Sequence, residues 1–223
     1  MKIGVIGAGN MSSALGSRWA AAGHELLIAG RTPEKAQALA GELGARSGSL
    51  REAAAFGDVV FVGIRREGVL DTLREAGAEE GTLKGRVLID CTNAIAEAED
   101  FRLVTADGPS VARQIAELTG AQVVKAFNVC HSEIWRNPPV VDGKPLAVPF
   151  SACDEATRAV AEQLIADVGA TPLHVGAIDR ADQIEALAAI VIRMLVLGAD
   201  PHSVIPPAQA RPEQAEELEQ AQA

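Results

Sequence analysis

Short apolar runs alternate with longer segments of helix-forming composition along the first 128 residues of the chain. The apolar runs, each predicted to be a β-strand, occupy residues 2–6, 26–29, 58–64, 87–90 and 122–127. The run 58–64 is apolar at nearly every position, which is typical of a strand buried on both faces of a parallel sheet. Predicted helices separate the strands and occupy residues 13–22, 36–43, 50–56, 67–76 and 110–119. Because strands that alternate with helices require crossover connections, the pattern predicts an α/β fold with a Rossmann-type, doubly wound parallel sheet.

The pattern changes after Asn128, where a loop rich in proline and glycine, 136–145, precedes a further strand–helix–strand series. The predicted strands are 146–150 and 171–175, and the predicted helix between them is 154–168. We therefore predict three parts: a Rossmann domain at 1–128, a smaller C-terminal α/β extension at 129–200, and a flexible tail at 201–223 that is rich in alanine, glutamine and glutamate.

One predicted helix of the extension, 184–197, is apolar on almost all of its faces. Glu185 and Arg193 are its only charged residues, and it is too short to span a bilayer. An apolar helix of this kind needs cover on every side, either in the core or at a subunit interface. We therefore expect a homodimer, and we expect no membrane as a partner.

A glycine-containing turn, Gly7-Ala8-Gly9-Asn10-Met11-Ser12, follows the first strand and opens the first helix. It has most of the dinucleotide-binding pattern G-x-G-x-x-G, with Ser12 in place of the third glycine. A strand that leads through such a turn into a helix aims backbone N–H groups and the positive end of the helix dipole at one point, which suits a pyrophosphate. The turn therefore predicts a nucleotide-binding site, and the alternative is an ordinary structural turn between strand and helix.

The end of the second strand indicates which nucleotide binds. A cofactor with a free ribose 2′-hydroxyl is usually held by an aspartate or glutamate about 20 residues beyond the glycine turn, and this chain has none at that point. It has Arg31, Thr32 and Lys35 instead, which offer a guanidinium, a hydroxyl and an ammonium to a phosphate. We therefore predict NADP(H) as the cofactor. Thr32 and Pro33 are also typical of a helix start, and both interpretations can hold together.

Parallel sheets bind ligands beyond the carboxyl ends of their strands, so the other strand ends supply further candidates. These are Ile64, Arg65, Asn93 and residues 128–131. Arg65 and the adjacent Arg66 either hold an anionic group of the cofactor or substrate, or form a solvated pair.

No catalytic constellation stands out in the sequence. His131 is the candidate catalytic side chain, although a surface or capping role is the favoured interpretation. His131, Ser132 and Glu133 are residue types of a catalytic triad, but adjacent side chains point apart and cannot form a relay. Lys125, in an apolar strand, is expected to be paired or at the sheet edge rather than a Schiff-base lysine. The lack of a recognisable catalytic constellation fits hydride transfer, because the cofactor supplies the reactive bond and an acid or base is not obligatory.

Composition and charge exclude several classes of function. The formal net charge of −10 over 223 residues, with no basic stripe, argues against a nucleic-acid partner. Cys91, Cys130 and Cys153 are odd in number and lack C-x-x-C spacing, so we expect neither a disulfide framework nor a metal site. No segment resembling a signal peptide precedes the first strand, and we predict a cytoplasmic location with a small-molecule substrate.

Four stretches of the sequence are distinctive when taken together. They are Gly-Ala-Gly-Asn-Met at 7–11, Ala-Gly-Arg-Thr at 29–32, Asp-Cys-Thr-Asn at 90–93 and Val-Val-Lys-Ala-Phe-Asn at 123–128. With these stretches the chain resembles, to about residue 197, the NADPH-dependent oxidoreductases of the deazaflavin coenzyme F420. The resemblance implies a Rossmann domain, a small C-terminal segment that completes a nicotinamide pocket, a homodimer, and direct hydride transfer between NADP(H) and the deazaflavin.

The resemblance also implies roles for residues that match by position. The turn 7–12 would hold the pyrophosphate, residues 31, 32 and 35 the 2′-phosphate, and Asn93 with residues 126–128 would border the nicotinamide. Together with two strand-end residues, the predicted cofactor-binding residues are Gly7, Gly9, Asn10, Met11, Ser12, Arg31, Thr32, Lys35, Ile64, Arg65, Asn93, Ala126 and Asn128. The chain differs from the usual family pattern at residues 12, 65–66 and 151–154 and after residue 198, which leaves the hydride acceptor open.

Three functions are compatible with these features. The first is hydride exchange between NADPH and coenzyme F420, and the second is NADPH-dependent reduction of a small C=N or C=O compound, as in an imine or ketone reductase. The third is an NADP-sensing module without turnover. Reduction of an imine would benefit from a nearby proton donor such as His131, whereas the deazaflavin reaction would not.

Overall fold

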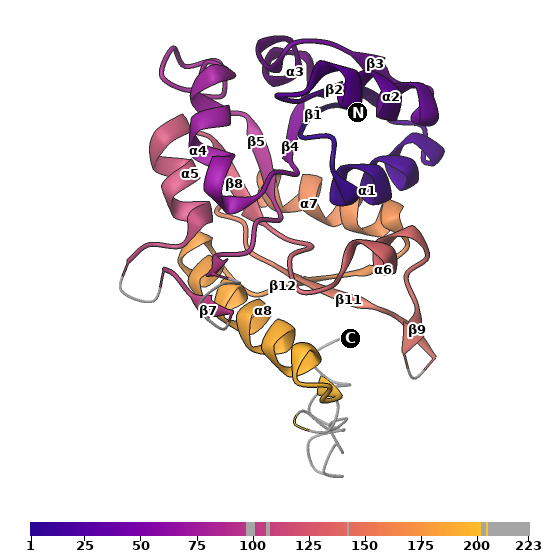
Figure 1. Cartoon of the computed structure of the whole chain (residues 1–223), viewed down its shortest axis with the longest axis vertical. Coiled ribbons are helices and arrows are strands. Elements are labelled where there is room, and N and C mark those ends of the chain that lie inside the picture. The colour runs from indigo at the N-terminus through magenta and orange to yellow at the C-terminus, as the bar shows by residue number, and fades with distance from the viewer. Residues whose placement is uncertain (97–100, 106–107, 142, 202–203, 205–223) are drawn as a thin grey trace.

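The fold is built on a six-stranded parallel sheet (Figure 1). The computed structural model describes residues 1–96, 101–105, 108–141, 143–201 and 204, and its strands lie in the order β3-β2-β1-β4-β5-β8. The strands are β1 (Lys2–Ile6), β2 (Glu25–Ala29), β3 (Arg46–Ser47), β4 (Val59–Val62), β5 (Val87–Asp90) and β8 (Gln122–Lys125). The chain adds strands outward from β1 on one side and then on the other. This doubly wound order confirms the predicted Rossmann-type fold and places a topological switch point between β1 and β4.

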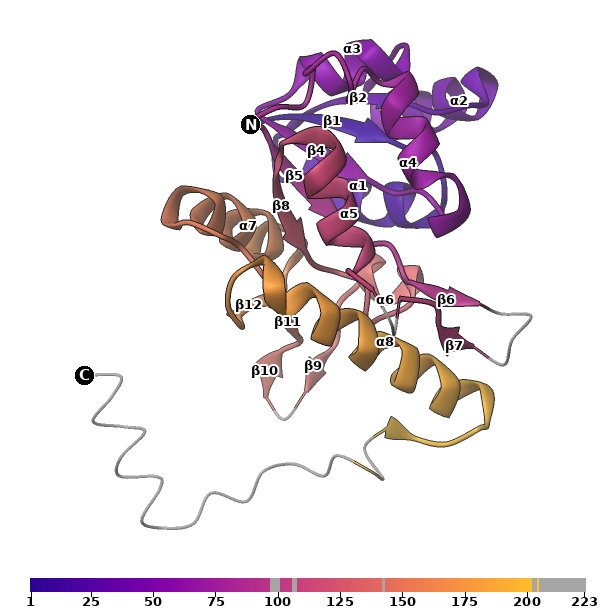
Figure 2. The ribbon, with the colours of Figure 1, turned by 90° about the vertical axis from the view of Figure 1, so that its left-hand side faces the viewer.

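Helices cover both faces of the sheet, as Figures 1 and 2 show from two sides. One buried apolar cluster contains side chains of α1 (Asn10–Ala21), α2 (Pro33–Leu43) and α7 (Glu155–Val168). A second cluster, on the other face, contains side chains of α3 (Leu50–Phe56), α4 (Arg66–Glu75) and α5 (Val111–Thr119). The strands between them are buried on both faces, which explains why the sequence of each central strand is almost entirely apolar.

Trp19 of α1 joins the C-terminal extension to the Rossmann sheet. Its ring is fully buried and meets the rings of Phe61 and Phe127 edge-on, with centroid distances of 5.2 Å and 6.1 Å. Its indole Nε1 donates a hydrogen bond to the carbonyl of Leu164 in α7 at 3.0 Å. Because the ring contacts and the satisfied indole N–H favour the same arrangement, α7 is fixed against the sheet.

The extension contains β11 (Ala147–Phe150) and β12 (Thr171–His174), which pair in parallel and are connected by α7. This is the predicted strand–helix–strand series, with ends shifted by one residue. It is followed by a short 3₁₀ turn, η2 (Ile178–Arg180), and by α8 (Ala181–Val196), which runs below the sheet in Figure 2. Among the described helices, none combines the length and apolarity needed to cross a membrane. Of the tail predicted at 201–223, only residues 201 and 204 lie within the described part of the chain.

Several short elements have no counterpart in the sequence-based prediction. They are α6 (Ser132–Arg136), β3, the pair β6 (Ile95–Ala96) and β7 (Arg102–Leu103), and the pair β9 (Val140–Val141) and β10 (Lys144–Pro145). A two-residue strand is too short for its own alternation to be recognised, and its partner strand defines it instead. The loop predicted at 136–145 is therefore wrong in part. The strand predicted to end at 127 ends at Lys125, and Phe127 has a positive φ of 64°, which no strand accommodates.

Candidate functional site

A cleft of about 320 Å³ opens at the carboxyl ends of β1, β2 and β4, at the topological switch point. It gathers seven of the predicted cofactor-binding residues, which come from three separate parts of the sequence. The residues that line it are Gly7, Ala8, Gly9, Gly30, Arg31, Thr32, Lys35, Gly63, Ile64, Arg65 and Thr72. Ala8 was predicted only as part of the turn 7–12, and Gly30, Gly63 and Thr72 were not predicted.

Gly7, the first residue of the glycine turn, fits against the end of β4 only without a side chain. Gly7 has a φ of +117°, and a Cβ on it would lie less than 3.0 Å from the carbonyl oxygen of Gly63 on the adjacent strand. Gly9 is the N-cap of α1 and offers no side chain to the first-turn N–H groups, and that turn holds no acidic residue. These N–H groups are therefore available to an anion at the helix N-terminus. Asn10 is exposed and Met11 half-buried in the same turn, and neither lines the cleft.

Ser12 occupies the position of the usual third glycine but does not face the cleft. Its side chain is fully buried, and its Oγ has no hydrogen-bond partner among the described residues. A Cβ on Gly63 would lie less than 3.0 Å from this Oγ. The glycine at the end of β4 thus provides the space that the serine on α1 fills, and the close approach of helix and strand is kept.

A group of cations lines the cleft at the ends of β2 and β4. The side chains of Arg31, Lys35 and Arg65 have no hydrogen bond or ion pair within the described residues, and no carboxylate lines the cleft. The Arg31 guanidinium lies against α4, since a Cβ on Gly68 would be 3.0 Å from its Nη2. Thr32 is the N-cap of α2 without a side-chain capping bond, so its hydroxyl is also available. In a chain with a net charge of −10, this local excess of positive charge suits a phosphate.

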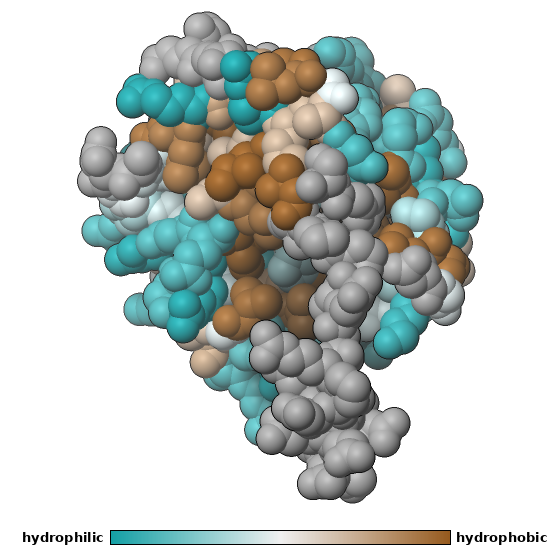
Figure 3. All heavy atoms as spheres, turned by 90° about the horizontal axis from the view of Figure 1, so that it is seen from below, coloured by the Kyte–Doolittle hydropathy of each residue, from teal (hydrophilic) through white to brown (hydrophobic). Residues whose placement is uncertain are grey.

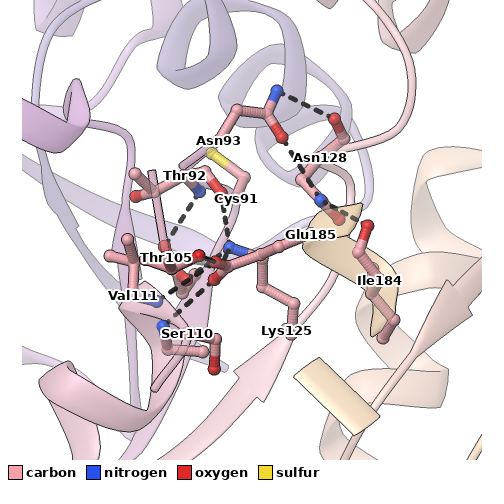
Figure 4. A network of polar contacts seen from close by, with 12 residues as sticks. Cys91, Thr92, Asn93, Thr105, Ser110, Val111, Lys125, Asn128, Ile184 and Glu185 are labelled. Atoms are coloured by element: carbon pink, nitrogen blue, oxygen red, sulfur yellow. Dashed lines mark hydrogen bonds and ion pairs between the residues drawn. The ribbon is translucent and has the colours of Figure 1, made fainter. Parts of the chain in front are cut away.

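Asn93 and Asn128 lie further along the same edge of the sheet, beyond the ends of β5 and β8, and form a closed pair (Figure 4). Asn93 Nδ2 donates to the Asn128 carbonyl at 3.0 Å, and Asn128 Nδ2 donates to Asn93 Oδ1 at 3.3 Å. Ala126, also predicted to bind cofactor, is fully buried, and its N–H donates to the carbonyl of Asp90 at 3.0 Å. These three residues are not in the wall of the cleft described above.

A buried ion cluster adjoins the Asn93–Asn128 pair. Lys125 Nζ contacts Asp90 Oδ2 at 2.8 Å and Glu185 Oε1 at 3.0 Å, and all three side chains are buried. The predicted pairing of Lys125 is thereby confirmed. Glu185 also accepts bonds from the backbone N–H groups of Val111 and Ala112, at the start of α5, at 3.2 Å and 3.3 Å. Residue spacing gives no signal for this contact, because Glu185 lies on a helix far along the chain.

Burial and mutual attraction set the ionisation of this cluster. Desolvation acts to lower the pKa of Lys125, but the carboxylates of Asp90 and Glu185 outweigh it and hold that pKa above its usual range. Desolvation also raises the pKa of Glu185, because the attraction of Lys125 only partly offsets it. Lys125 is therefore charged at neutral pH, which excludes it as the neutral amine that a Schiff base requires.

His131, the candidate catalytic residue, is placed outside the cleft. It is exposed and is the N-cap of α6, where its Nδ1 accepts from the backbone N–H of Glu133 at 3.4 Å. This geometry supports the capping interpretation, and its catalytic role stays a prediction. The cysteines are free, and burial raises the pKa of Cys91 to about 12, so that its thiol is protonated. The described residues contain no cluster of side chains that could hold a metal ion.

Residues 2–94 match the family model described as "NADP oxidoreductase coenzyme F420-dependent". This match confirms the family resemblance for the N-terminal part of the chain. The chain is also 30% identical, over 187 residues, to Metalloreductase STEAP3 of Rattus norvegicus. That similarity covers 83% of this chain but 36% of the relative, so the chain corresponds to little more than a third of the relative's length.

Solved structures share the fold. A crystal structure from Arthrobacter sp. FB24, described as a provisional F420-dependent NADP-reductase, superimposes with a TM-score of 0.79 at 25% identity, covering 89% of this chain and 96% of that chain. An imine reductase from Myxococcus stipitatus, in complex with NAD⁺, superimposes with a TM-score of 0.62 at 20% identity, covering 89% of this chain and 62% of the reductase. At this lower identity the second likeness concerns the fold alone.

Proposed function

We propose that this chain, which matches the coenzyme F420-dependent NADP oxidoreductases over residues 2–94, is an NADP(H)-dependent oxidoreductase with a small-molecule substrate. The observation that carries the proposal is the combination, in one cleft, of a glycine turn at a helix N-terminus with three unpaired cations and no carboxylate. The turn fits a pyrophosphate, and Arg31, Thr32 and Lys35 fit a 2′-phosphate. Ile64 and Arg65 would close the wall on the β4 side.

The order of the strands sets the direction in which the cofactor lies. If its 2′-phosphate is held by Arg31 at the end of β2 and its pyrophosphate by the turn after β1, the nicotinamide must extend the other way. That direction leads across β4 toward β5 and β8, where Asn93 and Asn128 lie. Bound NADP(H) would supply the hydride. The residues of this chain would bind it, orient its nicotinamide and exclude water, which are the protein's tasks in such a reaction.

As hydride acceptor we propose coenzyme F420. The family match supports this acceptor, and hydride exchange between two rings needs no acid or base group. Reduction of an imine or ketone is the alternative, and it would require a proton donor, for which His131 is the candidate. An NADP-sensing module without turnover is the second alternative.

We also propose that the chain forms a homodimer through the second half of α8. Ile190, Leu195 and Val196 are 60%, 56% and 52% exposed, and Leu197 just beyond the helix is 65% exposed. Figure 3 views the molecule from below, the side on which α8 lies in Figure 1, and shows hydrophobic side chains gathered on that face. A contiguous apolar surface of this kind is typical of an interface. The cytoplasmic location stays a prediction.

Titration with NADPH and NADH tests the cofactor assignment. Arg31→Ala should weaken NADPH binding by about 10-fold to 150-fold, because a charge-assisted bond to phosphate contributes about 1.5–3 kcal/mol. NADH, which has no 2′-phosphate, should bind the variant as it binds the parent. Arg51→Ala is a matched control, since Arg51 lies on the surface of α3 in an exposed ion pair with Glu80. Equal losses for both cofactors in the Arg31 variant would contradict the 2′-phosphate assignment.

A further inference from the structure

Stability alone does not explain the buried ion cluster of Asp90, Lys125 and Glu185. Its members come from β5, β8 and α8, and the side chains of Lys125, Asp90 and Glu185 are all completely buried. Removing charges from water is expensive, and replacing a buried ion cluster by neutral residues of similar volume is often neutral or stabilising. The reason for its presence is therefore to be sought in what it holds.

The cluster holds the backbone of Thr92 at both of its polar groups (Figure 4). Lys125 Nζ donates to the Thr92 carbonyl, and the Thr92 N–H donates to Asp90 Oδ1 at 2.9 Å. Thr92 directly precedes Asn93, whose side chain is half-buried at the edge of the sheet. The two charges on β5 and β8 thus define where the Asn93 carboxamide lies.

The Asn93–Asn128 pair is also tied to α8. Asn128 Nδ2 donates to the carbonyl of Ile184 at 3.3 Å in addition to its bond to Asn93, and Ile184 directly precedes Glu185. Both hydrogens of Asn128 Nδ2 are therefore used, which fixes the orientation of its carboxamide. Asn93 uses one N–H and one lone pair of its carboxamide in the pair, so one of each remains for a ligand.

Unsatisfied polar atoms surround the network. Within the described residues, Thr92 Oγ1, Asn128 Oδ1 and Ser151 Oγ are buried and have no hydrogen-bond partner. The Ser151 backbone N–H donates to the Lys125 carbonyl, so all three belong to the same small region. A buried polar atom without a hydrogen-bond partner destabilises a fold. Local departures from the most stable arrangement are typical of sites whose geometry serves a ligand.

We propose that Lys125, together with Asp90, is a positioning residue for the nicotinamide end of the cleft. The two residues fix Thr92 and thereby the Asn93 carboxamide, whose free N–H and lone pair contact the carboxamide of the nicotinamide. The two carboxamides are chemically complementary, because each offers a donor and an acceptor. Glu185 pairs with the same ammonium from α8, and its backbone hydrogen bonds go to α5 rather than to Thr92 or Asn93, so it is not one of the positioning residues. This inference rests on the proposed function, since it requires that NADP(H) occupy the cleft.

The test compares two neutral versions of the cluster. In Asp90→Asn/Lys125→Met/Glu185→Gln the amine is removed without leaving a buried carboxylate unpaired. The new amide oxygens can still accept from the N–H groups of Thr92 and Ala112. The amide nitrogens cannot accept, so the Val111 N–H loses its partner together with the loss of the hold on the Thr92 carbonyl. Glu185→Gln alone is the matched control, because it leaves Lys125 with Asp90 and the Thr92 carbonyl. A urea titration of each variant verifies that it folds.

Two ligands distinguish binding at the 2′-phosphate end of the cleft from binding at the nicotinamide end. Adenosine 2′,5′-bisphosphate carries the 2′-phosphate and lacks nicotinamide, whereas NADPH carries both. In the triple variant we expect NADPH affinity to fall about 10-fold, the effect of losing roughly one hydrogen bond, and bisphosphate affinity to change less than about 2-fold. Glu185→Gln should bind both ligands as the parent does. Asn93→Ala, with an intact cluster, should reproduce the selective loss of NADPH affinity.

Each outcome bears on one claim. If the parent binds neither NADPH nor the bisphosphate, the proposed function is wrong. If the parent binds both, and the folded triple variant loses both equally or neither, Lys125 does not position the nicotinamide end. If the triple variant does not fold, Asn93→Ala decides the matter: unchanged NADPH affinity overturns the inference, and a selective loss supports it.

Discussion

The contact between Ser12 and Gly63 leads to a prediction about the departure from the usual glycine pattern. Gly63 has no positive φ, so its backbone accepts an alanine, but the added Cβ would lie less than 3.0 Å from Ser12 Oγ and 2.9 Å from Phe61 Cε1. Both neighbours are buried and cannot move away freely. Overpacking of this kind costs about 1–3 kcal/mol. For a chain of this size each kcal/mol lowers the melting temperature by about 2–4 °C, so Gly63→Ala should melt about 2–12 °C below the parent.

The double variant Ser12→Gly/Gly63→Ala should recover part of that loss. Removing the serine side chain removes the clash with its Oγ and a buried hydroxyl that has no partner, and leaves only the contact with Phe61. Ser12→Gly alone should cost little, because a glycine within a helix loses about 0.5–1 kcal/mol while loss of the unsatisfied hydroxyl offsets this. It should retain NADPH binding. The two substitutions should therefore couple by about 0.5–3 kcal/mol.

Thermal melts followed by circular dichroism, together with NADPH titrations, measure the four-variant cycle. Gly41→Ala is the control, since Gly41 lies in α2 with no heavy atom within 4 Å of an added Cβ. It should leave stability unchanged or raise it by about 0.4–1 kcal/mol. If Gly63→Ala is as stable as the Gly41 variant, or if the two substitutions prove additive, the helix and strand do not pack as described.

Three further variants test the nucleotide-binding turn, the buried carboxyl group of Glu185 and the exposed face of α8. Ser12→Leu should abolish NADPH binding, because its longer side chain cannot fit between α1 and β4, and unchanged affinity would place the turn away from the phosphates. Burial raises the pKa of Glu185 above the usual 4.5, so folding favours the protonated carboxyl group. The stability that this protonated group contributes is fully present below pH 4.5. It is lost as the pH rises through the pKa of the folded state. The melting temperature of Glu185→Gln relative to the parent should therefore rise as the pH increases above about 4.5, and a constant difference would contradict the raised pKa. Leu195→Glu should convert a dimer to a single chain of 23.2 kDa by light scattering at micromolar concentration, while Ile134→Glu on α6 should not, and a parent protein of that mass would refute the dimer.

Local patterns predicted the sheet and most of the residues that line the cleft. The central strands are buried on both faces, so their apolar runs marked them clearly, and the glycine turn with Arg31 and Lys35 depends on residues near one another in the sequence. The strand boundaries differ by one or two residues where the backbone turns, as at Phe127. A glycine at a strand end, such as Gly63, is a signal of close backbone approach that could have been recognised.

Contacts between distant segments could not be predicted in the same way. The pairing of Lys125 was expected, but its partner Glu185 lies on a helix whose apolar composition suggested only burial. Its carboxylate is tolerated there because Lys125 and the first N–H groups of α5 satisfy it. The Asn93–Asn128 hydrogen bonds also require β5 and β8 to be neighbours in the sheet. The strand order makes them neighbours, and the apolar periodicity of the sequence does not reveal that order.

The decay of NADPH absorbance with added coenzyme F420 tests the proposed hydride transfer most directly. With the deazaflavin present we expect NADPH oxidation, and His131→Ala should keep most of its rate, because hydride passes between two rings and His131 is an exposed helix cap. A set of small imines and ketones run in parallel should give no turnover. Oxidation with imines or ketones alone, slowed by about 100-fold or more in His131→Ala, would contradict the deazaflavin assignment and favour the alternative reductase. Absence of oxidation with every acceptor, despite tight NADPH binding, would contradict hydride transfer itself.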